Sequence, residues 1–423
     1  MAPDRNEIAA TREQAYAHLT GELLPFWLER CLDEKHGGFV THFDKDGNDT
    51  GVDEKSLIMQ ARCLYTLASA HRAGYGEGRC RELAERGVEF LLDKFWDETD
   101  GGFFWLCDRA GEIRIDKKIL YGQSFAIYAL SEYALATGDA GTGDFAERTF
   151  EIIRRRCFDP AHGGYLEMFD RQWRLAAPGP AGGDRKTLDV HMHLMEAFTA
   201  LYEHIGDEEH GDALREVIDI LVHRMLHPDY GTGVAQFKPD WQIASQIKFD
   251  VVWGWDRFPD EGRQAKPPDN TSFGHNLELS WLLIHAMKIL GRELDECSDV
   301  LRKLIDHAVA NGIDWDCGGV YVEGPHAGGV SDREKEVWQQ AEALIGLLDA
   351  CLLFGVDTYW PAYRNVHEFV FDKVIDHRLG EWRPLLTRDG EPIWTHLGHN
   401  WKTNYHTVRS MIQSIRRLDQ LLS

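Results

Sequence analysis

Apolar and polar positions along this chain alternate between two kinds of helix-length segment. The first kind has little charge, much alanine, and apolar residues at helical spacing. Six such segments occur, at 56–73, 121–137, 191–205, 275–290, 337–354 and 405–422. Because apolar residues cover almost every side of these segments, we expect six inner helices that are buried all round.

The second kind of segment is amphipathic, with charged residues on one side and apolar residues on the other. We expect six outer helices of this kind, at 7–30, 79–96, 145–158, 213–226, 300–310 and 363–375. Between an outer and an inner segment lies a repeated loop in which an acidic residue is followed by glycine and a bulky residue, as in Asp33 to Phe39. Short aromatic runs such as 39–43, closed by Asp46-Gly47, predict small β-hairpins after these loops.

Six repeated pairs of helices predict a closed barrel. The fold class is therefore all-α, an (α/α)6 barrel of six helix pairs with short β-hairpins in the loops at one face. An open solenoid is the alternative, but it needs polar capping repeats, and neither end of the chain looks atypical. We expect one catalytic domain over 1–423, because no Pro/Ser/Gly-rich linker divides the chain. The segment 253–270 is an insertion in the fourth unit and a candidate lid.

Composition excludes several classes of partner. The net charge is −24, and the one basic cluster, Arg154-Arg155-Arg156, fits an exposed helix face, so we expect no nucleic-acid binding. The first residues are polar, and we expect no apolar run long enough to span a bilayer, so we expect no signal peptide and no membrane association. Eight scattered cysteines without a Cys-x-x-Cys pair indicate reduced thiols and a cytoplasmic location.

Polar and aromatic side chains concentrate at the starts of the inner segments, where six loops converge. Aromatic faces together with forked polar groups are typical of a sugar-binding pit. The candidates are Gln60, Arg62, Tyr121, Gln123, Asp189, His191, His193, His275, Asn276, Glu278, Glu336, Trp338, Gln340, Glu342, Trp401, Lys402, Tyr405, His406 and Arg409.

The histidines differ in what their spacing allows. His191 lies two positions from His193, so the two do not share a helix face, and we expect His191 to be structural. His275 and Glu278 are three apart and do share one, so the carboxylate could polarise the imidazole. Neither pair supplies a full set of ligands, and we expect no metal. A second candidate catalytic histidine, His406, lies in an unusually polar stretch of the last inner segment.

Asp314 and Asp316 could form the carboxylate pair of a glycoside hydrolase. They lie, however, in the repeated loop, where aspartate is a common turn residue. We therefore expect a structural role for them.

At these residues the sequence resembles the N-acylglucosamine 2-epimerase superfamily, and within it the group of cellobiose 2-epimerases and mannose 2-epimerases. The matching stretches are 60–62, 189–197, 273–278 leading to 280–283, 335–343, and 401–406, which follow the order of the family over nearly the whole chain. The family fold is an (α/α)6 barrel. The resemblance implies epimerisation of a reducing aldose at C2 without a cofactor.

The resemblance also implies roles for individual residues. His275 and His406 match the two acid/base histidines, His193 matches a third histidine near the reacting carbons, and Glu278 matches the carboxylate partner of His275. The implied substrate-binding residues are Arg62, Tyr121, Asp189, Trp338, Glu342 and Trp401. The expected partner is a small sugar, and the protein is expected to be a monomer or a homodimer.

The sequence departs from the family pattern at three places. Asp189 stands where cellobiose 2-epimerases usually have Asn, Val337 replaces the first of two tryptophans, and Thr403-Asn404 replaces Cys-Pro. A weaker aromatic platform favours free mannose and glucose over a disaccharide. The alternatives are a mannose–fructose isomerase, an inverting glycoside hydrolase on the same barrel, and a sugar-binding protein without catalysis.

Overall fold

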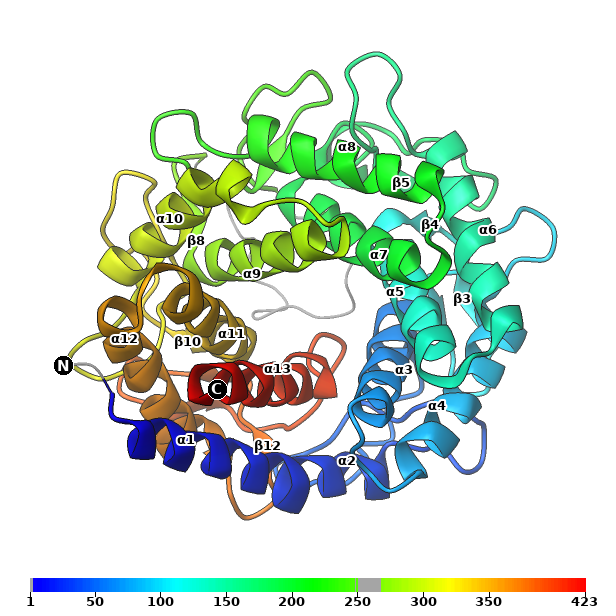
Figure 1. Ribbon diagram of the computed structural model, residues 1–423. Coiled ribbons are helices and arrows are strands. Elements are labelled where there is room, and N and C mark those ends of the chain that lie inside the picture. Colours follow the sequence, from blue (N-terminus) through cyan, green and yellow to red (C-terminus); the bar gives the residue numbers. More distant parts are fainter. Residues whose placement is uncertain (1–2, 248, 250–267) are drawn as a thin grey trace.

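Two concentric rings of helices form the protein (Figure 1). The computed structural model describes residues 3–247, 249 and 268–423. Within them, α13 packs against both α11 and α3, which closes the inner ring and confirms the predicted (α/α)6 barrel. The inner helices are α3 (Leu57–Arg72), α5 (Leu120–Thr137), α7 (Leu188–Ile205), α9 (Phe273–Ile289), α11 (Val337–Phe354) and α13 (Asn404–Leu422).

The outer ring follows the amphipathic segments, several of which end in a short π-helical stretch. The outer helices are α1 (Arg5–His18) continued by η1 (Leu19–Leu23) and α2 (Leu24–Arg30), α4 (Arg79–Phe90) with η2 (Leu91–Phe95), α6 (Ala140–Arg156), α8 (Glu208–Arg224), α10 (Ser298–His307) between η4 (Leu294–Cys297) and η5 (Ala308–Gly312), and α12 (Val356–Phe369) with η6 (Val370–Val374). Three of them, α6, α8 and α12, start five to seven residues earlier than predicted. Asp139 sets the start of α6, because its carboxylate accepts the backbone N–H of Thr142.

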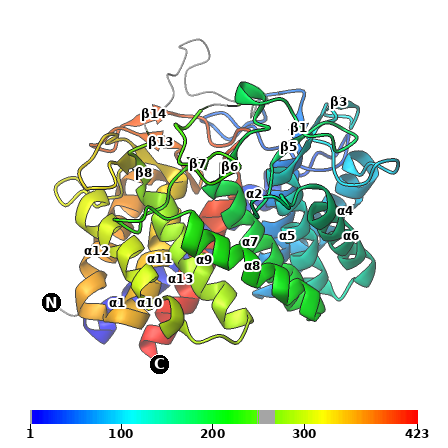
Figure 2. The ribbon, with the colours of Figure 1, turned by 90° about the horizontal axis from the view of Figure 1, so that it is seen from above.

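Short strands gather at the end of the barrel where the inner helices begin (Figure 2). Most pair antiparallel with a strand of the neighbouring unit, as in β1–β2, β4–β5, β6–β7, β8–β9 and β10–β13. The strands are β1 (Lys55–Ser56), β2 (Leu106–Cys107), β3 (Ile113–Ile115), β4 (Lys118–Ile119), β5 (Met168–Phe169), β6 (Lys186–Thr187), β7 (Gln236–Phe237), β8 (Thr271–Ser272), β9 (Glu323–Gly324), β10 (Lys335–Glu336), β11 (Ile375–Asp376), β12 (Glu381–Trp382), β13 (Leu385–Leu386) and β14 (Pro392–Trp394). One 3-10 turn, η3 (Gly179–Ala181), precedes β6. This strand layer holds the loops of adjacent units together around the mouth.

Buried lysines anchor the repeated acidic loops. In four units a lysine two positions before the inner helix reaches the acidic residue of the loop, and in the sixth unit the corresponding lysine reaches Glu381, just after the loop glycine. The Nζ–O distances are 2.8–3.2 Å. The pairs are Lys55–Asp33, Lys118–Asp97, Lys186–Asp159, Lys335–Asp314 and Lys402–Glu381. Arg388 also binds Asp314, whose Oδ1 accepts the N–H groups of Asp316 and Cys317. The expected structural role of Asp314 is confirmed.

A second repeated contact joins each loop to the fourth residue of the following inner helix. Gln60, for example, accepts the N–H of Phe39 through Oε1 at 2.7 Å and donates to its carbonyl through Nε2 at 2.9 Å. Gln123, His191, Asn276 and Gln340 make the corresponding contacts in four further units. These five residues therefore clamp the loops, and their placement among the pit candidates was wrong. The structural role expected for His191 is confirmed.

The apolar core is continuous around the barrel, and α11 runs through it. By length and composition α11 alone could cross a membrane among the described residues, so the expectation that no apolar run is that long was wrong. However, 78% of that stretch is buried inside the protein, as in the core helix of a folded domain. The burial follows from its place in the inner ring.

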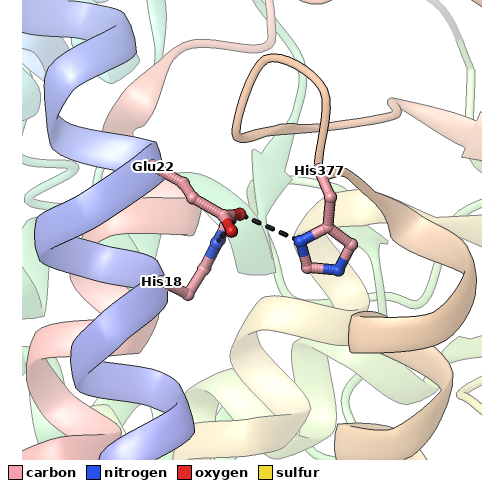
Figure 3. Close-up of side chains that lie close together, drawn as sticks. All are labelled: His18, Glu22 and His377. Atoms are coloured by element: carbon pink, nitrogen blue, oxygen red, sulfur yellow. Dashed lines mark hydrogen bonds and ion pairs between the residues drawn. The ribbon is translucent and has the colours of Figure 1, made fainter.

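The first and last units meet at a cluster of two histidines and a glutamate (Figure 3). His18 Nδ1 and His377 Nδ1 each lie 2.9 Å from Oε2 of Glu22. Trp382 donates its indole N–H to His18 Nε2 at 2.9 Å, which places the ring proton of neutral His18 on Nδ1. His377 Nε2 donates to the carbonyl of Phe371 at 2.8 Å. A metal ion here would need the lone pair of His18 Nδ1, but that atom bears the ring proton. We therefore interpret the cluster as a set of hydrogen bonds and an ion pair that joins the first and last units.

Candidate active site

A cavity of about 460 Å³ is lined by residues from the starts of the inner helices and from the strand layer. A volume of this size suits a small ligand. Nine of the ten predicted site residues line it: Arg62, Tyr121, Asp189, His193, His275, Glu278, Trp338, Trp401 and His406. The tenth, Glu342, is fully buried behind His406.

His406 is the third residue of α13, whose start is capped by the hydroxyl of Thr403. Its Nδ1 lies 2.6 Å from Oε1 of Glu342 on α11. Burial lowers the pKa of His406 to about 3 against the opposing effect of Glu342, so the ring is neutral near pH 7. A neutral ring that donates Nδ1–H to a carboxylate keeps a lone pair on Nε2, which is the form of a general base.

His275 is the third residue of α9, and Ser272 caps that helix by accepting the N–H of His275 at 3.2 Å. The imidazole is 28% exposed, and burial lowers its pKa. Trp338 of α11 packs against it with ring centroids 4.6 Å apart, and the same indole lies 6.0 Å from the ring of His406. Two neutral imidazoles from separate helices therefore border one aromatic face in one cavity.

The carboxylate beside His275 is not the expected one. Oδ1 of Asp189 lies 3.7 Å from Nε2 of His275, whereas Oε1 of Glu278 contacts Arg409 at 3.1 Å. The prediction that Glu278 pairs with His275 was wrong. A spacing of three residues puts both side chains on one face of α9, but each finds its partner on a neighbouring helix, Asp189 on α7 for His275 and Arg409 on α13 for Glu278. Burial raises the pKa of Glu278, and the nearby carboxylate of Glu342 raises it further.

His193 lies between two carboxylates of its own helix, α7. Nδ1 is 2.9 Å from Oε2 of Glu196, and Nε2 is 3.3 Å from Oδ1 of Asp189. Burial alone would lower its pKa, but these two partners outweigh it and raise the pKa to about 9. The rings of Tyr121 and Phe125 pack against the imidazole at 5.2 and 4.7 Å. His193 is thus a buried cation at neutral pH.

One guanidinium binds three buried carboxylates beneath the cavity. Arg409 binds Glu196 through one terminal nitrogen, and it binds Glu278 and Glu342 at 3.1 and 2.7 Å through the other. Glu278, Glu342 and His406 are close enough together to hold a metal ion by distance. Because Arg409 already supplies the positive charge there, these groups are poorly suited to a divalent cation.

Arg62 lines the cavity from α3. Its guanidinium donates to the hydroxyl of Tyr121 at 2.9 Å and to the carbonyl of Trp401 at 3.4 Å. It also lies over the rings of Phe125 and Tyr405, at 4.4 and 5.0 Å. Aromatic faces and two hydrogen bonds thus hold a cation at this part of the cavity.

Sequence reasoning missed several residues of the cavity wall, among them Glu167, Gln236, Phe249, Asn270, Glu323 and Trp394. They lie in loops or in strands of two or three residues, where no helical spacing marks them. Glu167 is buried, which raises its pKa to about 8, and it accepts the hydroxyl of Thr187 at 3.0 Å. The candidate lid at 253–270 falls mostly in 253–267, outside the described residues.

Comparison with known proteins gives consistent results. The sequence model of the N-acylglucosamine 2-epimerase (GlcNAc 2-epimerase) family matches residues 37–410. The chain is 30% identical to a cellobiose 2-epimerase of Bacteroides fragilis, over 95% of this chain and 98% of that one. It is 24% identical to a D-mannose isomerase of Marinomonas mediterranea, over 95% and 96%. The structure of a cellobiose 2-epimerase from Spirochaeta thermophila superposes with a TM-score of 0.83 at 28% identity, over 98% of both chains.

Proposed function

The chain belongs to the N-acylglucosamine 2-epimerase family and is a sugar epimerase or isomerase, and we propose that it interconverts glucose- and mannose-type aldoses at C2 without a cofactor. The observation that carries the proposal is the placement of His275 and His406. Both are neutral, both line one cavity, and both border Trp338. Two bases around one bound sugar suit inversion of a single carbon.

The reaction starts from the open-chain form of the sugar, in which the C1 aldehyde makes the C2 proton acidic. One imidazole removes this proton as a general base. The C2–H electron pair moves into a C1–C2 double bond, and the C1 oxygen takes up the negative charge. The cations of His193 and Arg62 are available to stabilise that oxygen.

Inversion requires that a proton return to the opposite face of C2. The second imidazole takes up a proton from solvent and delivers it to C2, and the C1 aldehyde re-forms as the charge leaves its oxygen. The first imidazole then releases its proton to solvent, so that both bases end neutral. The carboxylate beside each base stabilises the imidazolium that forms during its turn. Glu342 has this role for His406 and Asp189 has it for His275.

The charge of the cavity wall favours a neutral sugar. Asp189, Glu323 and Glu336 supply carboxylates to it, against the cations of Arg62 and His193, so the wall has no excess positive charge to hold an anionic substrate such as a sugar phosphate. Free mannose and glucose are the proposed substrates, and a β-1,4-disaccharide is the second choice. A cytoplasmic location is part of the proposal, because the eight cysteines are free thiols and seven are buried.

Proton NMR in deuterated buffer tests the function directly. The protein is incubated with mannose, glucose or cellobiose, and the C2 proton signal and the new sugar are followed together. We expect C2–H to be replaced by deuterium while the C2 epimer appears. An active protein that interconverts sugars without any exchange would contradict the proposal.

A mannose–fructose isomerase is the second candidate, and the similarity to D-mannose isomerases favours it. The same enediolate would then receive its proton at C1, and a ketose would dominate the product spectrum. The glycoside hydrolase is less well supported, because Asp314 is engaged by Lys335 and Arg388 in the loop layer. Release of reducing ends from an oligosaccharide would support the glycoside hydrolase instead.

A further inference from the structure

One oxygen of Asp189 lies between two of the cavity histidines. Oδ1 is 3.3 Å from Nε2 of His193 and 3.7 Å from Nε2 of His275. Asp189 is the second residue of α7, and its side chain is 37% exposed, toward the cavity that it lines. A single carboxylate oxygen therefore faces both imidazoles.

We propose that Asp189 is a positioning residue that holds His193 in its charged, doubly donating form and links the charge of His193 to that of His275 through one shared oxygen. Only the effect of Asp189 on the reaction rate rests on the proposed function. The charge state itself is a property of the resting protein.

The hydrogen bonds of His193 support this role. An imidazole that faces carboxylates at both nitrogens donates to both only as an imidazolium. Glu196 alone is a weak source of negative charge, because Arg409 and the hydroxyl of Tyr405 already bind it. Asp189 has no arginine or lysine ion pair within the described residues and supplies the remaining negative charge.

The other groups around His193 oppose or add little to its positive charge. His275 and Glu278 face it from α9, Tyr121 from α5, and Arg62 from α3 beyond Tyr121. Arg62 is a fixed cation, Glu278 is held toward its neutral form by burial, and His275 is neutral at rest. Among the residues that the structure describes, removal of the Asp189 charge therefore leaves no second anion to take its place on the Nε2 side.

The consequence for catalysis follows from the same geometry. As a cation, His193 stabilises the enediolate, and Asp189 stabilises His275 once that base has taken a proton. Activity is then expected to persist at alkaline pH until His193 loses its proton, with a limb near its pKa of about 9. An uncharged residue at position 189 would move that limb toward neutral pH.

The test compares the wild-type protein with Asp189→Asn, which keeps the side-chain shape, and with Asp189→Glu, which keeps the charge. In 15N-histidine-labelled protein the ring nitrogens are titrated by NMR, and His193→Asn identifies the signals of His193. A charged partner at hydrogen-bonding distance shifts a pKa by about 1–3 units, so we expect the His193 titration to fall by that amount in Asp189→Asn. Asp189→Glu should recover part of the shift.

Asp349→Asn is the matched control, because Asp349 is a buried carboxylate of an inner helix that pairs with Arg417 away from the cavity. It should leave the His193 titration unchanged. The alkaline limb of kcat/KM should move in parallel with the NMR titration in each variant. A His193 that titrates alike in wild-type and Asp189→Asn protein would overturn the inference, even in an active epimerase. Absence of sugar turnover in the wild-type protein would contradict the proposed function. The NMR titration would still determine the charge of His193.

Discussion

The bond between His406 and Glu342 yields a quantitative prediction. In Glu342→Gln the side chain keeps its size and loses its charge. Oε1 of Glu342 receives two donors, from His406 and Arg409, whereas Oε2 receives one, from the indole of Trp281 at 2.8 Å. The amide oxygen is therefore expected on the side of His406, with the NH2 group facing Trp281. The tautomer of His406 is then preserved, and only the charge is lost.

The size of the effect follows from the strength of the bond. A hydrogen bond to a charged group contributes about 1.5–3 kcal/mol and a neutral one about 0.5–1.5. The imidazolium that forms on His406 during the reaction thus loses roughly 1.4 kcal/mol, which is about tenfold in kcat/KM. In the variant the amide NH2 group faces the indole N–H of Trp281, so one buried donor has no acceptor. This lowers the free energy of unfolding by about 1–3 kcal/mol.

Mannose-to-glucose conversion measured by NMR gives kcat/KM, and thermal unfolding gives the stability. Glu132→Gln is the matched control: Glu132 is buried on the inner helix α5, binds Arg72 at 3.1 Å, and lies outside the cavity wall. It should lose stability while kcat/KM stays within about twofold of wild type. The reasoning fails if Glu342→Gln keeps kcat/KM within threefold of wild type, or if Glu132→Gln loses as much.

Three further changes test other parts of the structure. Trp338→Ala should raise KM roughly tenfold with a smaller change in kcat, because it removes an aromatic face that contributes about 1–1.5 kcal/mol of binding free energy. An unchanged KM for mannose would show that this face does not bind the sugar. Asp97→Asn leaves the buried ammonium of Lys118 without its charged partner and should lower the free energy of unfolding in urea by about 3–5 kcal/mol. The additional change Lys118→Met should recover part of this loss. Equal stability of the single variant and wild type would contradict the role of the loop anchors. Burial alone would lower the pKa of His377, but the carbonyl of Phe371 and the carboxylate of Glu22 raise it, so the stabilisation that His377 provides is complete below about pH 6.5 and disappears as the pH rises through its raised pKa. The melting temperature of His377→Gln should therefore fall below that of wild type at pH 6 and equal it at pH 9, and a deficit that grows with pH would be the wrong sign.

The helices show which parts of the fold could be predicted from the sequence. Apolar spacing located all six inner helices within a few residues, because burial on every side leaves an uninterrupted apolar pattern. The starts of the outer helices were missed where the first turn has few apolar residues, as at Glu208-Glu209 in α8. In α8 these acidic residues suit the dipole of the first turn, and in α6 the capping residue Asp139 sets the boundary; periodicity reports neither signal.

The candidate site was predictable in its residue types but not in its pairings. The sixth residue of every inner helix points to one level of the barrel, where Arg62, Phe125, His193, Glu278, Glu342 and Arg409 lie. Which of these bind one another depends on the rotation of each helix about its own axis. That is why Glu278 was assigned to His275 in place of Asp189. The loop lysines and the fourth-residue clamps, in contrast, recur at fixed positions and could have been found by aligning the helix starts.

The central claim is that two imidazoles act on one carbon, and exchange measured with single-histidine variants tests it most directly. His275→Asn and His406→Asn are each incubated in deuterated buffer with pure mannose and with pure glucose, and loss of the C2 proton is followed by NMR. Both variants should lose interconversion, and each should retain exchange with only one of the two sugars, a different one in each case. A variant that still interconverts the sugars, or that exchanges both, would contradict the two-base account.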